Sequence, residues 1–222
     1  MKKVSIGVLV SGSGSNLQAI IDQIEQGRLL AEISVVISNN PDAYALERAA
    51  KHGLPRDVIN YRDFTNREDF DRTAVAVLRS YDVELVILAG FMRVLTPLFL
   101  KAFPVKVMNI HPALLPAFPG LHVQQQALEY GVKFAGCTVH FVEEGVDTGP
   151  IIIQAVVPVF DDDTTETLSA RILREEHRIY PQAIQLYAEG RLKVRGCKVA
   201  VSDGMHSESL ALHNPLLTLF HD

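Results

Sequence analysis

The chain has 222 residues, of which 48% are hydrophobic and 21% are charged, and its formal net charge is -5 at pH 7. This composition is typical of a globular protein with a sizeable core, and the acidic balance argues against a nucleic-acid surface, which needs a basic patch. Two cysteines without a CxxC pattern argue against a disulfide framework and favour a reducing, cytoplasmic setting. No apolar stretch approaches the length of a membrane span.

The amino-terminal segment predicts a strand, a glycine-rich loop and a helix. An apolar run over Val4–Val10 precedes Gly12 and Gly14, and Ser15 or Asn16 can cap a helix with apolar residues at helical spacing. This arrangement places amide groups around an anion. The loop lacks the third glycine of a dinucleotide motif and the ending of a triphosphate loop, so it favours a smaller phosphate ester. A glycine-rich turn without a ligand is the alternative.

The rest of the chain continues this alternation to about residue 130 and then changes. We expect further strands at 33–37, 54–59, 84–89, 105–110, 133–142, 150–159 and 192–199, and further helices at 42–52, 67–80, 123–130 and from 163 or 164 to about 187. Pro181 is expected to kink or break the last helix. The pattern predicts an α/β fold, a single-domain Rossmann-like open sheet that is mainly parallel, with an antiparallel C-terminal extension and a long late helix. Residues 1–200 form the predicted domain and residues 201–222 a C-terminal tail.

The stretch VKVMNIHPALLPAFP carries the first candidate for chemistry. Asn109 and His111 stand two positions apart at the end of a predicted strand, so their side chains point the same way. Ligands bind beyond the carboxyl ends of strands in a parallel sheet, and three prolines stiffen the loop that follows. The alternative is that both side chains only satisfy loop carbonyls.

Asp147 is the second candidate, because Gly145 and Gly149 flank it in a loop that can present a carboxylate. A surface aspartate in a turn is the plainer interpretation. An amide can donate to an oxyanion, a histidine can pass a proton, and a carboxylate can orient the imidazole. No metal-ligand spacing, nucleophile elbow or reactive-cysteine motif is present in the sequence, so the residues favour acyl transfer between two bound substrates.

Five separated motifs resemble those of the phosphoribosylglycinamide formyltransferase family, the folate-dependent transferases of purine biosynthesis. They are SGSGSNLQAII, LAGFMRVL, NIHPALLPAFPGLH, GCTVHFVEEGVDTGPII and EEHRIYP, and together they span the chain to about Val194. The resemblance implies transfer of a formyl group from 10-formyltetrahydrofolate, a co-substrate, to the amine of phosphoribosylglycinamide, without a metal. It also implies a cytoplasmic enzyme of one-carbon metabolism that is a monomer or a homodimer.

The resemblance also implies residue roles. Asn109 holds the formyl oxygen as it becomes an oxyanion, protonated His111 stabilises that charge and moves a proton, and Asp147 keeps His111 charged and oriented. The nucleotide-binding residues are Gly14, Ser15, Asn16, Leu17 and Gln18 at the phosphate and Glu176 at the ribose. The folate-binding residues are Arg67, Met92, Arg93, Val94, Leu95, Asn109, Glu143, Glu144, Gly145, Val146 and Asp147.

The sequence departs from the family at two positions. Ser13 stands where the family often has asparagine, and Leu173 stands where a polar contact to the nucleotide is expected. Formyltetrahydrofolate deformylase and methionyl-tRNA formyltransferase resemble the same core and share the trio, but they usually carry a regulatory or an RNA-binding domain that we do not expect here. A catalytically silent folate-binding module is the remaining alternative, and the intact trio argues against it.

Overall fold

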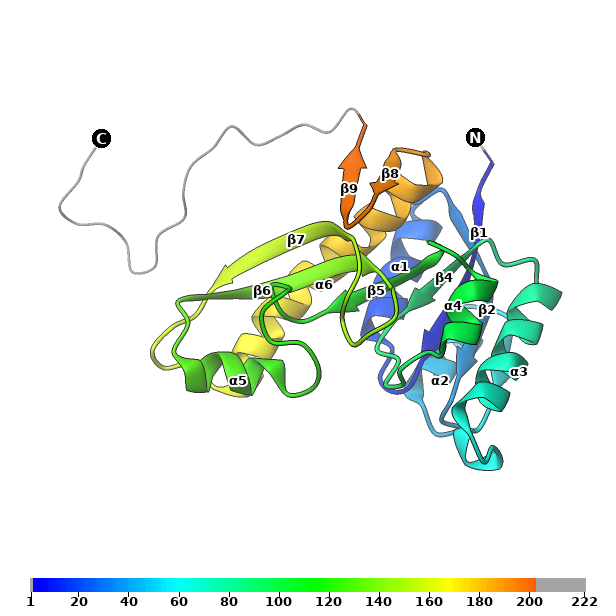
Figure 1. Cartoon of the computed structure of the whole chain (residues 1–222), viewed down its shortest axis with the longest axis horizontal. Coiled ribbons are helices and arrows are strands. Elements are labelled where there is room, and N and C mark those ends of the chain that lie inside the picture. Colours follow the sequence, from blue (N-terminus) through cyan, green and yellow to red (C-terminus); the bar gives the residue numbers. More distant parts are fainter. Residues whose placement is uncertain (1, 203–222) are drawn as a thin grey trace.

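The computed structural model describes residues 2–202, which fold around one nine-stranded sheet of order β3-β2-β1-β4-β5-β6-β7-β9-β8 (Figure 1). The strands are β1 (Val4–Val10), β2 (Ala31–Ser38), β3 (Arg56–Val58), β4 (Leu85–Leu88), β5 (Val107–His111), β6 (Phe134–Phe141), β7 (Ile151–Pro158), β8 (Leu192–Arg195) and β9 (Lys198–Val201). The helices are α1 (Ser15–Glu25), α2 (Tyr44–Lys51), α3 (Arg67–Ser80), α4 (Pro97–Ala102), α5 (Val123–Tyr130) and α6 (Thr165–Ala188), with a 3₁₀ turn at Tyr61–Asp63. The predicted open, mainly parallel α/β sheet is confirmed.

The sheet reverses its winding direction between β1 and β4. β2 and then β3 lie on one side of β1, whereas β4 and then β5 lie on the other side. Neighbouring strands in this part of the sheet are parallel. In such a sheet a crevice opens beyond the carboxyl ends of the strands at the reversal point. The glycine loop follows β1, the expected folate-binding residues Met92 to Leu95 follow β4, and Asn109 and His111 lie at the end of β5. The topology therefore brings all three to one edge.

The C-terminal part extends the sheet by antiparallel pairing, as predicted. β6 runs antiparallel to β5, which sets His140 opposite Asn109, and β7 runs antiparallel to β6. The register of β6 and β7 shifts between Val139 and His140. Such an irregularity bends a strand and turns the side chains beside it.

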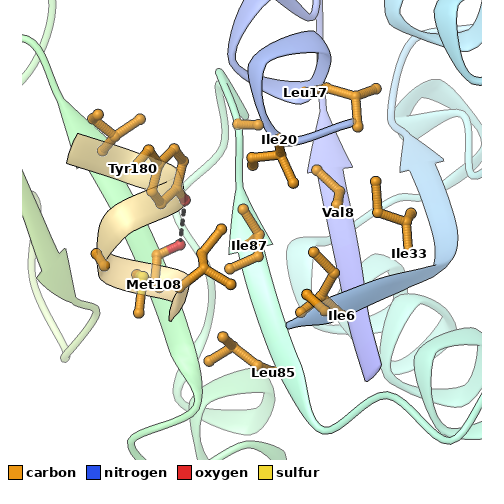
Figure 2. Packing of buried hydrophobic residues seen from close by; sticks show 14 of the residues in the cluster. Ile6, Val8, Leu17, Ile20, Ile33, Leu85, Ile87, Met108 and Tyr180 are labelled. Carbon is orange, nitrogen blue, oxygen red and sulfur yellow. Dashed lines mark hydrogen bonds between the residues drawn. The ribbon is translucent and has the colours of Figure 1, made fainter. Parts of the chain in front are cut away.

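Helices cover both faces of the sheet. The core on one face joins β1, β2 and β4 to α1 and α6, and Figure 2 shows Ile6, Val8, Leu17, Ile20, Ile33, Leu85 and Ile87 in it. α3 and α4 cover the other face through a second buried cluster. A third cluster joins α5 and the first half of α6 to β6 and β7. Full burial of each large side chain contributes roughly 1.5–3 kcal/mol, so the helices hold the strand ends in fixed positions.

One buried tyrosine ties α6 to the strands that carry the predicted site. The Tyr180 hydroxyl lies 2.8 Å from the carbonyl oxygen of Met108 and 3.0 Å from that of Leu88, and Figure 2 shows the first contact. Burial raises the pKa of Tyr180 well above its ordinary value, so the hydroxyl keeps its proton and donates. The contact fixes the backbone of β5 directly before Asn109.

One prediction about helices is wrong, and one of two alternatives for the last helix is excluded. The N-cap of α1 is Gly14, with a left-handed backbone at φ 69°, and neither Ser15 nor Asn16 caps it. Both residues lie within the helix, and the side chain of Asn16 instead donates to Glu176, 160 residues away. α6 is continuous through Pro181. Proline removes one helical hydrogen bond, but buried side chains on both sides of it hold the two halves against the sheet.

The end of the described chain differs from the prediction as well. The expected strand at 192–199 is a hairpin of two strands, because Gly196, with φ 58°, turns the chain between β8 and β9. The sequence did not predict the short helix α4, which begins at Pro97. Most of the expected tail, residues 203–222, lies outside the described residues, and none of the helices in residues 2–202 is both long and apolar enough to cross a membrane.

Candidate functional site

A cleft opens where the ends of β4 and β5 meet the loop between β6 and β7. Its inner cavity is lined by Asn109 and His140, together with Leu88, Phe91, Arg93, Val94, Leu95, Val142, Glu143, Gly145, Val146 and Asp147. An outer cavity of about 500 Å³ shares three of these residues and adds Arg67 and Glu144 to the lining. Every residue of the predicted folate-binding group except Met92 therefore lines one of these two cavities.

Met92 has a different place. Its side chain is exposed, and its backbone N–H donates to the Ser11 hydroxyl at 2.9 Å. Ser11 in turn donates to the Asn39 side-chain oxygen at 2.7 Å. These two contacts join the loops that follow β4, β1 and β2, so Met92 supports the edge of the crevice through its backbone.

Asn109 faces the cleft from β5. Its amide nitrogen lies 3.2 Å from Nε2 of His140 on the neighbouring strand. The residue is partly exposed and lines the inner cavity. A primary amide carries two N–H donors, so one of them remains for a ligand.

His111 is the last residue of β5, and its side chain is almost completely buried. Its Nε2 lies 2.8 Å from the Phe118 carbonyl oxygen, and its Nδ1 lies 3.4 Å from Oδ1 of Asp147. Both ring nitrogens thus face oxygen atoms that accept hydrogen bonds. The side chain is thus held between the proline-rich loop and the β6–β7 loop.

The backbone of the β6–β7 loop aims Asp147 at His111. Asp147 itself has a left-handed backbone at φ 51°, and Gly145 and Gly149 have φ 129° and 117°. A Cβ at Gly149 would lie 2.1 Å from the Phe141 carbonyl oxygen, so only glycine fits there. Oδ2 of Asp147 accepts the backbone N–H of Gly120 at 2.8 Å. The carboxylate is therefore fixed by two loops at once.

Arg93 borders the inner cavity with its guanidinium group stacked on aromatic rings. The guanidinium carbon lies 4.7 Å from the ring centre of Phe70 and 5.2 Å from that of Tyr61. Cation–π contacts of this kind hold the group in place. The cleft thus has a fixed positive charge at its wall.

The glycine loop after β1 begins α1 in a tight contact with α2. A Cβ at Gly14 would lie 2.6 Å from the Cβ of Ala45, and the backbone at Gly14 is left-handed. The N–H of Ala45 donates to the Gly12 carbonyl oxygen at 3.0 Å. The loop therefore has one closely fitted conformation, with the first N–H groups of α1 free of intrahelical partners.

Asn16 and Glu176 meet below this loop. The Asn16 amide donates to Oε2 of Glu176 at 2.7 Å, and both residues are more than nine-tenths buried. Burial raises the pKa of Glu176, and the hydrogen bond from Asn16 lowers it in part. Within residues 2–202, Oδ1 of Asn16 has no hydrogen-bond partner. This pair combines a carboxyl group and a free acceptor, which suits a ligand with hydroxyl groups.

Sequence reasoning missed two residues beside the loop. Arg48 of α2 donates through Nε to the Ser13 carbonyl oxygen at 2.8 Å and through Nη1 to the Gln18 side chain at 3.1 Å. Arg48, Ser15, Gln18 and His177 line one shallow cavity. Burial lowers the pKa of His177, and the charge of Arg48 lowers it further. Arg48 lies in an ordinary amphipathic helix, so no pattern in the sequence marks it.

Other groups can be set aside. The Leu17 side chain is fully buried in the core, so only its backbone can reach a ligand. Burial raises the pKa of Cys137 to about 12, which leaves this thiol protonated. In the part of the chain that the structure describes, no cluster of His, Cys, Asp or Glu side chains could hold a metal ion. The remaining chemistry is the Asn109 amide and the Asp147 carboxylate, which line the inner cavity, with the buried imidazole of His111 against that carboxylate.

Comparisons with known proteins agree on one family. Residues 4–184 match the family model described as formyl transferase. The phosphoribosylglycinamide formyltransferase of Haemophilus influenzae is 45% identical over 204 residues, which cover 92% of this chain and 95% of that protein. The crystal structure of glycinamide ribonucleotide transformylase 1 from Symbiobacterium toebii superposes with a TM-score of 0.89 at 55% identity, covering 90% of this chain and 95% of that one.

Two further relatives are longer than this chain. The trifunctional purine biosynthetic protein adenosine-3 of Drosophila pseudoobscura pseudoobscura is 51% identical over 190 residues, and the matched part spans 85% of this chain but only 14% of that protein. A formyltetrahydrofolate deformylase from Pseudomonas syringae has a TM-score of 0.85 at 27% identity, covering 91% of this chain and 67% of that one. The same core thus occurs in proteins of different size and activity.

Proposed function

The chain belongs to the formyl transferase family, and within it to the phosphoribosylglycinamide formyltransferases, and from this we propose that it transfers the formyl group of 10-formyltetrahydrofolate to the amine of 5-phosphoribosylglycinamide. The observation that carries the proposal is the grouping of three side chains: Asn109 and Asp147 line the inner cavity, and the buried His111 lies with its Nδ1 3.4 Å from Oδ1 of Asp147. The product is a formylated ribonucleotide, an intermediate of purine biosynthesis. The folate acts as a co-substrate, and we propose no metal.

The reaction needs no residue of the protein as a nucleophile. The amine nitrogen attacks the formyl carbon, a C–N bond forms, and the formyl oxygen becomes an oxyanion. The bond from that carbon to N10 of the folate then breaks and the carbonyl returns. N10 takes up one proton while the amine nitrogen loses one, so atoms and charge balance between the two substrates.

Asn109 donates the hydrogen bond that stabilises the oxyanion. Its second N–H is available to the inner cavity, and removal of one such donor typically lowers turnover about 10²- to 10³-fold. The charged imidazole of His111 stabilises the same intermediate and moves the proton to N10, and Asp147 keeps the ring charged and oriented. Since Nε2 of His111 bonds to the Phe118 carbonyl here, the substrate must replace that carbonyl as its partner.

The folate lies in the cleft in this proposal. Val94, Leu95, Gly145 and Val146 offer an apolar wall to its ring system, and Met92 contributes backbone support. Arg93 in the inner cavity and Arg67 in the outer one supply positive charge for the acidic part of the folate. Glu143, Glu144 and Asp147 complete the lining with acceptors for the N–H groups of the ring.

The ribonucleotide lies along the glycine loop. Backbone amides at Gly14 to Leu17 cradle the phosphate at the start of α1. Gln18 contributes its side chain, because its backbone N–H donates to the Gly14 carbonyl oxygen at 3.0 Å. Glu176 accepts hydrogen bonds from the ribose hydroxyls. Arg48 supplies the positive charge for the phosphate, because it is already anchored to the loop through Ser13 and Gln18. Arg48 thereby replaces the polar contact to the nucleotide that the family is expected to make from position 173, where this chain has leucine.

We propose a cytoplasmic enzyme, a monomer or a homodimer, with neither a nucleic acid nor a membrane as partner. In this proposal the formyltransferase domain includes residues 1–200 and the whole of β9, which ends at Val201, while residues 203–222 lie outside the described residues. The two cysteines support the reducing setting, since Cys137 is buried and Cys197 is exposed, and neither is in a disulfide bond.

A formyl-transfer assay tests the function. Purified protein is mixed with 10-formyltetrahydrofolate, and the folate absorbance is followed with and without phosphoribosylglycinamide. Loss of the formyl group only in the presence of the nucleotide is the expected result. Loss without the nucleotide would instead identify a hydrolase, the second candidate, which the likeness to a deformylase favours. Absence of reaction in both cases would contradict the proposal and leave a folate-binding module.

A further inference from the structure

His140 is a buried histidine that the proposed reaction does not use. It lies on β6 directly opposite Asn109, and only 1% of its surface is exposed. The β6–β7 register shifts at this residue, which turns its side chain toward the inner cavity that it helps to line. A buried imidazole beside an oxyanion donor calls for an explanation, because a hydrophobic residue would fill the same space at lower cost.

Its hydrogen bonds fix which ring nitrogen carries the proton. Nδ1 of His140 lies 3.0 Å from the Phe141 carbonyl oxygen and 3.2 Å from the Thr148 carbonyl oxygen. Carbonyl oxygens only accept, so Nδ1 must be the protonated nitrogen. In the neutral ring Nε2 is then an acceptor, and it lies 3.2 Å from the amide nitrogen of Asn109.

The tautomer in turn fixes the orientation of the Asn109 amide. With the amide nitrogen toward Nε2, one N–H is bound and the second remains for the cavity. If the amide were turned over, its oxygen would face the lone pair of Nε2, which is unfavourable. Burial lowers the pKa of His140, the charge of Asp147 opposes that shift and the charge of His111 adds to it. The neutral ring is therefore the resting form.

We propose that His140 is a positioning residue, which holds the amide nitrogen of Asn109 in the orientation that donates to the formyl oxygen. This inference rests on the proposed formyl transfer. Through Thr148, the neighbour of Asp147, the same ring also ties the amide to the loop that carries the carboxylate. His140 thus links Asn109, the oxyanion donor, to the loop that carries Asp147.

Nitrogen NMR of the wild-type protein tests the tautomer directly. In protein labelled with ¹⁵N at histidine, the two ring nitrogens have distinct chemical shifts, and their couplings to the ring protons identify which one is protonated. We expect His140 to keep a proton on Nδ1 alone throughout the pH range of activity. A proton on Nε2, or a charged ring in that range, would overturn the proposal. This readout does not depend on turnover or on any variant being folded.

A double-mutant cycle tests the positioning. We expect Asn109→Ala to lower kcat about 10²- to 10³-fold and His140→Leu to lower it at least about 10-fold, with KM for both substrates changed less than about threefold. In the Asn109→Ala background, His140→Leu should have an effect of less than about threefold, because no amide remains to be oriented. Equal effects in both backgrounds would mean that His140 acts apart from Asn109, and the proposal would be wrong.

Val139→Ala provides the matched control. Val139 is fully buried next to His140 on β6, and its truncation destabilises the same strand. We expect kcat to remain within about threefold of the wild-type value, whereas a loss as large as that of His140→Leu would point to damage of the strand and contradict positioning. Failure of the proposed function is a separate result, since wild-type protein would then show no nucleotide-dependent transfer in the same assay.

Discussion

The two halves of the site hold their polar groups by different means. In the group that we propose to be catalytic (Asn109, His111, His140 and Asp147, the catalytic cluster), the fixed partners are mostly backbone groups, at Phe118, Gly120, Phe141 and Thr148. In the group that we propose to bind the nucleotide (Asn16, Gln18, Arg48 and Glu176, the nucleotide cluster), the main contacts join side chains from different helices. Backbone groups move only if the fold moves, so the first arrangement suits chemistry that tolerates little displacement. The side-chain contacts of the nucleotide cluster can rearrange when a ligand binds.

The clusters also differ in how completely their hydrogen bonds are satisfied. Both nitrogens of His111 and of His140 have partners, as do both carboxylate oxygens of Asp147. Among the described residues, Oδ1 of Asn16 in the second cluster has no partner, and neither has Nε2 of His177, the residue after Glu176. A buried polar atom without a partner costs about 1–3 kcal/mol. The nucleotide cluster is thus less stable than it could be, and a bound ligand can supply the missing partners.

Asp147→Asn should have the largest effect. It leaves the loop in place but removes the charge that faces His111, so we expect kcat to fall about 10²- to 10⁴-fold with little change in KM for either substrate. Steady-state kinetics over a range of pH measure both constants. The matched control is Asp82→Asn, because Asp82 has the same backbone φ of 51° and is exposed in the turn after α3. Unchanged turnover in Asp147→Asn would remove the carboxylate from the mechanism.

Arg48→Ala should act on binding instead. A charge-assisted hydrogen bond contributes roughly 1.5–3 kcal/mol, so we expect KM for phosphoribosylglycinamide to rise about 10- to 100-fold while kcat changes little. Arg48→Lys should recover only part of the affinity, since lysine lacks the planar fork that reaches both Ser13 and Gln18. Arg79→Ala, on an exposed turn of α3, is the control. A fall in kcat with unchanged KM would assign Arg48 to the catalytic cluster.

This contrast also explains what the sequence could predict. Asn109, His111 and Asp147 stand at a strand end and between two glycines, and such local patterns are visible in one chain. The ranges 4–10, 67–80 and 123–130 were predicted to the residue, because caps and apolar periodicity are local too. Arg48 and His140 depend on which strands and helices become neighbours. Their contacts cross 30 or more residues, and no spacing rule covers that distance.

The errors have the same cause. The capping prediction failed at Asn16 because a residue 160 positions away competes for its side chain. Of the kink or break expected at Pro181, the break does not occur, because tertiary contacts of α6 outweigh one lost helical hydrogen bond. Glu176 left a weak signal in the sequence, since it interrupts the buried row of Leu168, Ile172, Tyr180 and Ile184 at four-residue spacing. The row alone did not show that Asn16 is the hydrogen-bond partner of Glu176.

Asn16→Ala should weaken ribonucleotide binding about tenfold, because it removes a hydrogen bond to a carboxyl group and one acceptor for the ligand. Folate binding should not change, since Asn16 lines neither cavity of the cleft. Titration calorimetry with each ligand measures the two affinities separately. Gln26→Ala, at the opposite end of α1, should alter neither. Equal losses for both ligands would contradict the assignment of the glycine loop to the nucleotide.

Glu176→Gln should have the smallest effect of these variants. Unlike the others, it should be a gain, namely a higher stability of the free protein. Burial raises the pKa of Glu176 in the folded chain, so ionisation is more costly there than in the unfolded chain. Below the ordinary pKa both states are protonated and no cost arises, whereas the cost grows as pH rises through the folded pKa. The variant removes it. We therefore expect the Tm of Glu176→Gln to exceed that of the wild type near neutral pH, and the difference to vanish in acid.

Thermal unfolding as a function of pH tests this expectation, with Glu175→Gln, the less buried neighbour, as the control. Glu176→Gln should also bind the ribonucleotide more weakly, because a neutral amide accepts hydrogen bonds from ribose hydroxyls less strongly than a carboxylate does. A lower Tm at neutral pH would mean that the Asn16 contact outweighs the burial of the charge. Greater stability together with weaker binding would show that the nucleotide cluster, unlike the catalytic cluster, sacrifices stability of the free protein for affinity.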